Sequence, residues 1–484
     1  MLFPTHEFLV FFAIIFTTSI FLKHQVSAYK YFLLFASLIF YSFWSLNFLG
    51  LLVTDTVINY LILKGISKNK HKKVFLILGL IVNLIYLGFF KYYNFFVDSL
   101  YELLNAVQLQ FSFPVLEILA PVGISFYTFR IIAHLVDCYR NQQQFPSFLD
   151  YAVYVTYFPQ IGSGPISRPN EFYTQLNSSK KYDYQIETVI ILIISGLFKK
   201  YTLSSFLFNF TQLPFSLPEQ YSSIDLILSA LAYSCLIYVD FSGYSDLANA
   251  ISSLLGFKPI ENFNMPYRSQ SLQEFWRRWH ISLSEWLRDY LYIPLGGSKK
   301  GKYRKHLNLF LTMVIGGFWH GAGLNFIIWG GLHGIGLIVN HLWKDFCKMF
   351  QHNSSSTMPS SQTSFQKLRA NIAQFCSLIL TFSFVTLCWI FFNTPNYENA
   401  IKFLQGMFNF NSGISTVQFN VWQLYVVLFI VLLMNFAGDK ISELFNKFLS
   451  SQHLLLQTTF IFSLLYVIFR LGPNTVPPFI YFNF

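Results

Sequence analysis

Long apolar runs recur along the whole chain, and their length predicts helices that cross a membrane. A helix needs about 18 to 20 apolar residues to span a hydrocarbon core about 30 Å thick. The runs lack the polar alternation that strands of a membrane barrel would show. The expected fold class is therefore an all-α polytopic membrane protein. The predicted spans cover residues 8–22, 31–48, 51–63, 74–90, 115–136, 187–208, 224–239, 307–318, 325–343, 372–392, 422–436 and 454–469.

Composition supports a membrane protein and narrows its partners. Hydrophobic residues make up 54% of the chain and charged residues only 11%, with a mean hydropathy of +0.45, so a soluble fold would lack polar surface. The net charge of +11 gathers in short loops, as membrane orientation signals do, so we expect contact with membrane lipids and no nucleic acid. The five cysteines show no C-x-x-C spacing, so neither a metal site nor a disulfide framework is expected.

The placement of basic residues predicts the orientation of the chain. No Lys or Arg precedes the first apolar run and no cleavage site follows it, so we expect a retained anchor. Lys23 and Lys30 follow this run, which puts the N-terminus outside the cytoplasm. Two further spans then bring the basic loop 64–73 to the cytoplasmic side, in agreement.

Changes in apolar and polar composition divide the chain into four regions. Residues 1–120 are predicted to form N-terminal transmembrane helices, and residues 371–484 C-terminal ones. Residues 346–370 form a polar loop, with a flexible Ser-rich stretch at 351–362. In residues 121–345, Gly, Pro, His and Arg interrupt the apolar sequence. Such residues persist at membrane depth only inside the protein or beside a wet cavity, so this region is expected to hold the functional site.

The segment 275–297, FWRRWHISLSEWLRDYLYIPLGG, predicts one amphipathic helix. At helical spacing an aromatic stripe lies opposite a polar stripe that contains Arg277, His280 and Arg288. Its charges make a lipid-buried span costly, so the helix should lie at the interface or line a cavity. The alternative is an interfacial helix with a tryptophan anchor and solvated arginines.

A basic loop, SKKGKYRKH, follows at residues 298–306. Its ordinary role is a positive-inside signal. Lys299 and Lys300 are in addition candidates for holding the phosphates of a nucleotide-bearing donor, because a basic cluster beside a cavity attracts them.

His320 is the candidate catalytic residue. The short apolar run 307–318 ends in the cluster GGFWHGAG, which would place His320 partway across the bilayer. An imidazole there is expensive to desolvate, and in its neutral form it can take a proton from a hydroxyl. The alternative is a histidine hydrogen-bonded for packing, which is the interpretation we favour for His333.

Irregular and ionisable residues elsewhere point to the same region. The segment 158–168, FPQIGSGPISR, contains two prolines and two glycines and predicts a re-entrant or interfacial loop. Arg130 and His134 are four residues apart, on one helix face, and would need a shared counter-charge or a wet cavity.

Two acidic and two basic residues lie in flanking apolar runs. Asp240 and Asp246, in YVDFSGYSD, are predicted partners for the arginines of the amphipathic helix. Lys199 and Lys200 are expected to extend their ammonium groups toward the membrane surface.

Together these motifs resemble the membrane-bound O-acyltransferase (MBOAT) family, in its bacterial alginate O-acetyltransferase branch. PVGISFYTFR, YFPQIGSGPISR, SGLFKK, VDFSGYSD, ENFNMPYRS, the RRWHIS block, GGFWHGAGLNFIIWGGLHG and the terminal PPFIYFNF occur in the order of that family. The resemblance implies about eleven transmembrane helices, with re-entrant and interfacial ones, around a central funnel. It assigns the catalytic role to His320 and an accessory role to His280.

The resemblance also implies a reaction. An acetyl thioester, acetyl-CoA, would be the donor substrate, with no bound cofactor and no metal. Arg277 or Arg288 would stabilise charge or orient the donor, and Trp319 and Asn325, beside His320, are further donor- or substrate-binding candidates. An extracytoplasmic acetyltransferase or esterase-fold partner would pass the acetyl group to a polysaccharide or peptidoglycan. The expected location is the bacterial inner membrane.

Two other functions stay open at this point. A D-alanyl transfer protein for teichoic acids uses related RWHIS and WHG blocks. From a different class, a proton-coupled lipid or solute transporter could use an intramembrane histidine as a proton relay, which predicts inverted repeats and uptake without acyl turnover.

Overall fold

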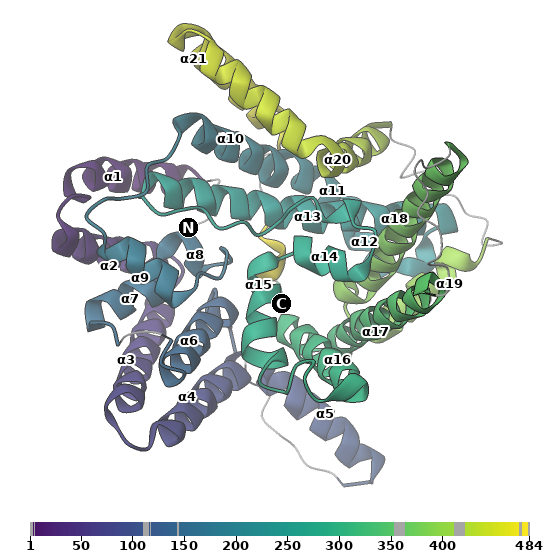
Figure 1. Ribbon diagram of the computed structural model, residues 1–484, viewed down its shortest axis with the longest axis horizontal. Helices are drawn as coiled ribbons and strands as arrows, with labels where there is room; N and C mark the ends of the chain where they lie inside the picture. Colours follow the sequence, from purple (N-terminus) through teal and green to yellow (C-terminus); the bar gives the residue numbers. More distant parts are fainter. Residues whose placement is uncertain are drawn as a thin grey trace.

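The computed structural model describes residues 3, 5–109, 116, 118–142, 145–352, 364–410, 422–473 and 477–482, and within these every regular element is a helix (Figure 1). The predicted all-α class is therefore confirmed. The N-terminal helices are α1 (His6–Leu22), α2 (Val26–Ser42), α3 (Leu46–Lys68), α4 (Lys72–Leu87), the π-helix η1 (Gly88–Tyr92) and α5 (Tyr93–Ala106).

The middle region contains many short helices as well as long ones. They are α6 (Ile124–Tyr139), α7 (Phe148–Thr156), α8 (Phe158–Ile161), α9 (Pro169–Asn177), α10 (Ile186–Leu197), the π-helix η2 (Phe198–Leu203), α11 (Ser204–Phe208), α12 (Gln212–Ser216), η3 (Pro218–Gln220), α13 (Ser223–Leu254), η4 (Pro266–Arg268), α14 (Leu272–Arg278), α15 (Ile281–Leu287), the π-helix η5 (Arg288–Tyr292), α16 (Gly301–His320) and α17 (Leu324–His352). The C-terminal elements are α18 (Ser364–Asn393), α19 (Tyr397–Phe408), α20 (Trp422–Ser451), α21 (Leu454–Leu471) and η6 (Ile480–Phe482).

The helices are long and apolar enough for a multi-pass membrane protein. In the described part of the chain, eight helical stretches qualify as candidate spans, and the apolar helices α1 and α2 are slightly shorter. Several predicted spans are shorter than the helices that contain them, such as 224–239 within α13, and two others differ in where they begin. Residue 115 lies outside the described residues, and α6 begins only at Ile124. The predicted span 307–318 was too short, because α16 continues backward through the basic loop to Gly301.

The long helix α13 organises the interior (Figure 1). It begins at a capping box in which Ser222 and Asp225 satisfy each other's backbone amides. Its C-terminal half packs into an apolar core with α1 to α4 and α6 to α9, and its N-terminal half packs into a second core with α14 and α17 to α20. The junction between these cores is where the candidate site lies.

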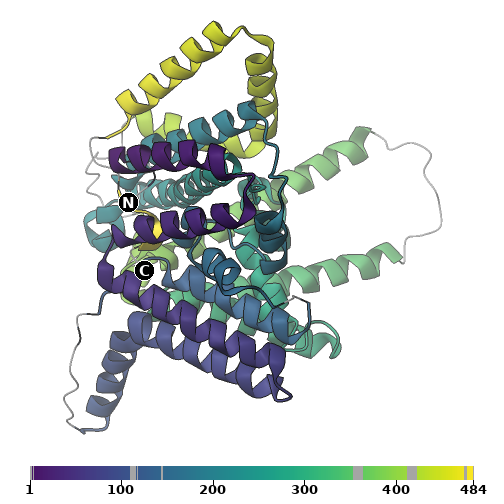
Figure 2. The ribbon, with the colours of Figure 1, turned by 90° about the vertical axis from the view of Figure 1, so that its left-hand side faces the viewer.

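The outer ends of α17 and α18 project from the helical body, as Figure 2 shows. The predicted polar loop 346–370 coincides with these ends, so helix continues to His352 and resumes at Ser364. The predicted flexible stretch 351–362 lies mostly outside the described residues.

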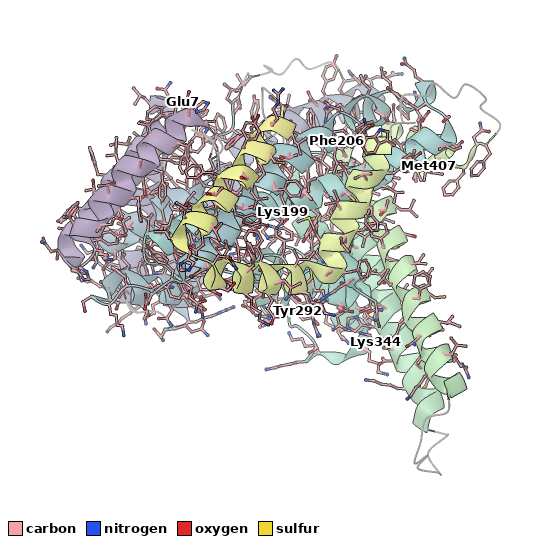
Figure 3. All side chains as sticks on the ribbon, turned by 90° about the horizontal axis from the view of Figure 1, so that it is seen from above. Glu7, Lys199, Phe206, Tyr292, Lys344 and Met407 are labelled. Atoms are coloured by element: carbon pink, nitrogen blue, oxygen red, sulfur yellow. The ribbon has the colours of Figure 1, made fainter. Side chains whose placement is uncertain are left out.

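Two ion pairs, one of them fully buried, connect η2 to α13. Figure 3 places Lys199 between the face that carries Glu7 and the opposite face that carries Tyr292 and Lys344. Lys199 Nζ lies 2.6 Å from Asp246 Oδ2. Lys200 Nζ lies 2.5 Å from Asp240 Oδ1. The expectation that these lysines reach toward the membrane surface was wrong.

The predicted partners of the two aspartates were also wrong, since Asp240 and Asp246 pair with lysines and not with the arginines of the amphipathic segment. The physical reason is the π-helical turn η2, whose extra residue redirects side chains relative to an α-helix. It turns two consecutive lysines toward one neighbouring helix.

The predicted amphipathic helix at 275–297 is broken in the structure. Helix α14 ends at Arg278, Trp279 is extended, and His280 adopts the left-handed conformation with φ +42° before α15 begins. A non-glycine residue in this conformation is strained and needs surrounding contacts to hold it. By contrast, the segment 158–168 is irregular after the single turn of α8, as predicted.

Candidate active site

His320 is the last residue of α16, at the junction of the two apolar cores. Its side chain is buried, and Gly321 leaves the helix in an extended conformation. Aromatic rings surround the imidazole, with ring centroids 4.8 to 5.4 Å away, at Trp319, Trp329, Phe392 and Tyr481. No side chain or backbone group of the described residues hydrogen-bonds to His320 Nδ1. A buried imidazole nitrogen without a protein partner is a candidate for binding substrate or water.

A cavity of about 70 Å³ lies beside His320. It has room for only a few waters, so it is too small to hold a whole acyl donor. Its walls come from five separate parts of the chain: Lys91, residues 120–126, Gly162, Trp319 with His320, and Tyr481. His320 is therefore positioned to act on a group that enters this cavity.

Two glycines allow α16 and α17 to touch backbone to backbone beneath His320. A Cβ added to Gly317 would lie 2.4 Å from the carbonyl oxygen of Phe326. A Cβ added to Gly330 would lie 2.3 Å from the carbonyl oxygen of Met313. Both distances are far inside van der Waals contact, so any side chain would push the helices apart. The close crossing fixes the position of the helix end that carries the imidazole.

Lys91 and Tyr92, which the sequence analysis did not single out, close the C-terminal end of α16. Lys91 Nζ donates to the carbonyls of Trp319 at 2.8 Å and His320 at 2.9 Å. Tyr92 Oη donates to the carbonyl of Phe318 at 2.8 Å. The last carbonyls of a helix lack partners within it, and these donors satisfy them. The sequence feature that could have indicated this role is the position of Lys91 directly after the apolar run 74–90.

His280 is near this site, one layer of aromatic rings away. Its ring centroid is 4.6 Å from that of Phe241 and 6.3 Å from that of Phe126, and both of these rings also contact Tyr481. Asn262 Oδ1 accepts hydrogen bonds from the backbone amide and hydroxyl of Ser282 and lies 3.1 Å from His280 Nδ1. Because that oxygen must be an acceptor, Nδ1 donates, and in the neutral ring Nε2 is the basic nitrogen.

The C-terminal segment, residues 477–482, packs beside the cavity although it is far in sequence from the other residues there. Asp240 Oδ2 accepts from the backbone amide of Ile480 at 3.0 Å, and Lys200 Nζ donates to the carbonyl of Pro477 at 3.3 Å. These bonds place Tyr481 against His320. The sequence analysis noted the terminal motif but gave no role to Tyr481, because nothing in the local pattern links residue 481 to residue 320.

Trp319 and Asn325 have different environments. Trp319 lines the cavity and stacks on Phe129, with centroids 4.6 Å apart. Asn325 Nδ2 donates to the carbonyls of Phe391 and Thr394 and so links α17 to the end of α18. The structure thus brings Trp319 to the cavity, while the amide of Asn325 is engaged in joining helices.

The basic candidates lie at the surface and do not line the cavity. Arg277, Lys299 and Lys300 are exposed. Arg288 is exposed too and pairs with Asp289 at 2.7 Å and with Glu285 at 3.8 Å. Their predicted role with the donor stays a prediction that requires the donor to extend from this surface to the cavity.

Arg130 and His134 are buried in α6 among tyrosines. Arg130 donates to the backbone carbonyl of Tyr154, and its guanidinium lies 4.7 Å from the centroid of that ring. His134 Nδ1 lies 3.2 Å from the hydroxyl of Tyr173. Instead of sharing a counter-charge, the two residues bind different tyrosines; no carboxylate of the described residues forms an ion pair with Arg130.

With this geometry in place, residues 38–385 match the model of MBOAT, the membrane-bound O-acyltransferase family. The chain belongs to this family. It is an O-acyltransferase and a multi-pass protein of the bacterial inner membrane. The eight candidate spans agree with such a fold, while the expected number of about eleven stays a prediction.

Relatives of this O-acyltransferase indicate its branch of the family. It is 37% identical to the peptidoglycan O-acetyltransferase of Helicobacter pylori over 417 residues, which cover 80% of this chain and 75% of the relative. It is also 37% identical to the probable alginate O-acetylase AlgI of Pseudomonas aeruginosa, over 78% of this chain and 70% of that protein. The teichoic acid D-alanyltransferase of Streptococcus thermophilus is 30% identical over 46% of this chain and 57% of its own length.

Proposed function

We propose that this O-acyltransferase moves an acetyl group from acetyl-CoA on the cytoplasmic side to an envelope glycan outside, with His320 as general base. The observation that carries the proposal is the imidazole of His320, which lies beside a cavity with one nitrogen that has no partner among the described residues. Relatives named for peptidoglycan and alginate acetylation support acetyl as the cargo and a glycan as the acceptor.

The chemistry is an acyl transfer that balances without a cofactor. An acceptor hydroxyl gives its proton to His320, and its oxygen attacks the thioester carbonyl. The C–S bond breaks as the new ester C–O bond forms, and the thiolate leaves with the proton from the imidazolium. His320 is neutral at the start and at the end, as a general base must be.

The donor side of the proposal rests on surface charge. Lys299 and Lys300 would attract the phosphates of acetyl-CoA, while the pantetheine arm would extend toward the cavity. Arg277 or Arg288 would assist at the same surface. On the other side, an extracytoplasmic acetyltransferase or esterase-fold partner would receive the acetyl group and deliver it to the polymer.

The test compares cells that produce this protein with cells that carry the His320→Ala variant at the same locus. Envelope glycans are isolated and treated with mild base, and the released acetate and D-alanine are quantified. We expect the acetate to fall to background in the variant while the D-alanine is unchanged. Immunoblots of membranes confirm equal amounts of protein.

Two results would oppose the proposal. Loss of D-alanine with unchanged acetate would assign the chain to teichoic acid D-alanylation. The weaker similarity to teichoic acid D-alanyltransferases makes this the main alternative. Unchanged release of both groups would remove acyl transfer by His320 to envelope glycans altogether.

A further inference from the structure

Helix α5 lies outside the packed helices, between two walls of the active-site cavity. Lys91, in the π-helix that leads into α5, lines the cavity, and so do residues 120–126, which follow α5 in the chain. None of the residues of α5 is buried. Asn94 Nδ2 donates to the carbonyl of Leu116 at 2.9 Å, so the returning chain lies against the start of α5. The position of α5 can therefore affect both walls.

The surface of α5 is divided into an apolar face and a polar face. Large apolar side chains recur four, three and four positions apart, as one face of a helix requires: Phe96, Leu100, Leu103 and, directly after the helix, Val107. They are between 41% and 63% exposed. The opposite face carries polar side chains: Asn94, Asp98, Glu102 and Asn105. An exposed apolar surface beside polar residues indicates an interaction site.

The length of the continuous helical stretch places α5 at the extracytoplasmic surface of the membrane. Residues 72–106 form 35 residues of consecutive helix, which would be about 50 Å long at 1.5 Å per residue. The hydrocarbon core is only about 30 Å thick, so about 20 of these residues suffice to cross it. The stretch begins at the basic loop 64–73, which marks the cytoplasmic side. The crossing therefore ends near η1, where α5 begins.

Helix α5 turns aside at this point and does not continue in the direction of α4. Figures 1 and 2 both show α5 crossing that direction, and Figure 2 shows α5 on the side of the N-terminus, opposite the projecting ends of α17 and α18. The π-helix η1 lies at the bend, and such turns are a recognised cause of kinks. A helix that lies along the membrane surface buries its apolar face about 5 to 10 Å into the lipid while its polar face stays in water.

The apolar face of α5 continues the lipid-facing surface of α4. Ile81, Ile85 and Phe89 are exposed apolar residues of the same candidate span and therefore face lipid. The next exposed large apolar residue along the chain is Phe96 of α5. A protein partner would have to cover α5 separately, whereas the lipid that covers α4 also reaches α5. Lipid is thus the occupant that this continuous surface favours.

We propose that α5 lies on the extracytoplasmic surface of the membrane with its apolar face in lipid, and that this contact holds the two cavity walls to which α5 is joined. The first part concerns the position of α5 and is independent of the reaction. The second part rests on the proposed function, because it predicts an effect on acetyl transfer.

The position of α5 is measured with nitroxide spin labels on the full chain, in vesicles of phosphatidylethanolamine and phosphatidylglycerol. The variants Cys347→Ser and Cys376→Ser first remove the two cysteines that are not buried. A single cysteine then carries the label on the apolar face, at Leu103, or on the polar face, at Asn105. Oxygen collides with the label mainly in lipid, and a nickel chelate mainly in water. We expect the ratio of oxygen to nickel collisions to be several-fold higher at Leu103 than at Asn105.

The effect on the cavity is measured by acetyl transfer. Inside-out membrane vesicles from the producing cells receive labelled acetyl-CoA, and the label in envelope glycan is measured. Leu100→Glu places a charge on the apolar face, and the matched control Asn105→Glu places the same charge on the polar face. We expect transfer to fall several-fold in Leu100→Glu and to stay at the wild-type rate in Asn105→Glu. If Leu100→Glu does not insert into membranes, the uncharged variant Leu100→Gln takes its place.

Each other outcome is decisive. Equal collision ratios on the two faces, with the nickel chelate reaching Leu103, would overturn the lipid contact and favour a protein partner on the apolar face. Wild-type transfer by Leu100→Glu protein, once the label at Leu103 shows that the helix has left the lipid, would overturn the link to the cavity. An equal loss in Asn105→Glu would overturn that link too, because the loss would not depend on the face. Absence of transfer in wild-type vesicles would instead contradict the proposed function and leave the spin-label result unaffected.

Discussion

Removing the charge of Asp240 while keeping its shape, in Asp240→Asn, is expected to destabilise the protein strongly. Both side chains of the Lys200–Asp240 pair are only 4% exposed, so the variant leaves an ammonium group buried without its counter-charge. Breaking a buried pair from one side costs about 3 to 5 kcal/mol. Asp240 also accepts from Ser204 and from the amide of Ile480, so the C-terminal segment should loosen as well.

The assay is reversible unfolding in mixed micelles, with SDS as the denaturant and tryptophan fluorescence as the signal. We expect the free energy of unfolding to fall by about 3 to 5 kcal/mol in Asp240→Asn. Replacing both partners, in Lys200→Met with Asp240→Leu, should recover part of this loss, because no buried charge remains although the amide of Ile480 loses its acceptor.

A surface pair provides the matched control. Lys402 and Glu219 form an ion pair at 3.0 Å, but their side chains are 47% and 70% exposed. Lys402→Met should therefore leave the unfolding curve nearly unchanged. If Asp240→Asn and Lys402→Met had the same free energy of unfolding, the argument that burial makes the Lys200–Asp240 pair important for stability would be refuted.

Two further predictions concern the helix crossing and the donor surface. Gly317→Ala should lower acetyl transfer at least tenfold and cost about 1 to 3 kcal/mol of stability, because the added Cβ overlaps α17. Gly331→Ala, where a Cβ would meet only ring atoms of Phe310 about 3.9 Å away, should change transfer less than twofold, and equal losses would contradict the crossing argument. Replacing Lys299 and Lys300 with Gln should raise the KM for acetyl-CoA several-fold at low salt and only slightly at high salt, because salt screens exposed charges. If the substitution changed KM equally at both salt concentrations, these lysines would not belong to the donor site.

The apolar pattern predicted the membrane helices because each span must bury its own backbone hydrogen bonds, whatever its neighbours are. It also placed His320 at the end of a helix, and the structure agrees. What it missed are features fixed by distant contacts. The helix break at His280 coincides with its hydrogen bond to Asn262, and no local periodicity predicts that bond.

The choice of charge partners was unpredictable for the same reason. Lys199 and Lys200 are 47 and 40 positions from the aspartates that they bind, and a π-helical turn decides where they point. Lys91 binds the end of α16 across more than two hundred positions. The sequence analysis singled out Lys199, Lys200 and the two aspartates as charges within apolar runs but not Lys91, and only the packed helices identify the partner of each.

The most direct test of the account measures labelled acetyl transfer in inside-out vesicles that carry His320→Asn, with His333→Asn as the control. Both residues are buried histidines in contact with Trp329. We expect the His320 variant to lose at least a hundredfold in rate, the usual minimum contribution of a general base, and the His333 variant to keep at least a tenth of the wild-type rate. Wild-type transfer by folded His320→Asn protein would contradict the central claim.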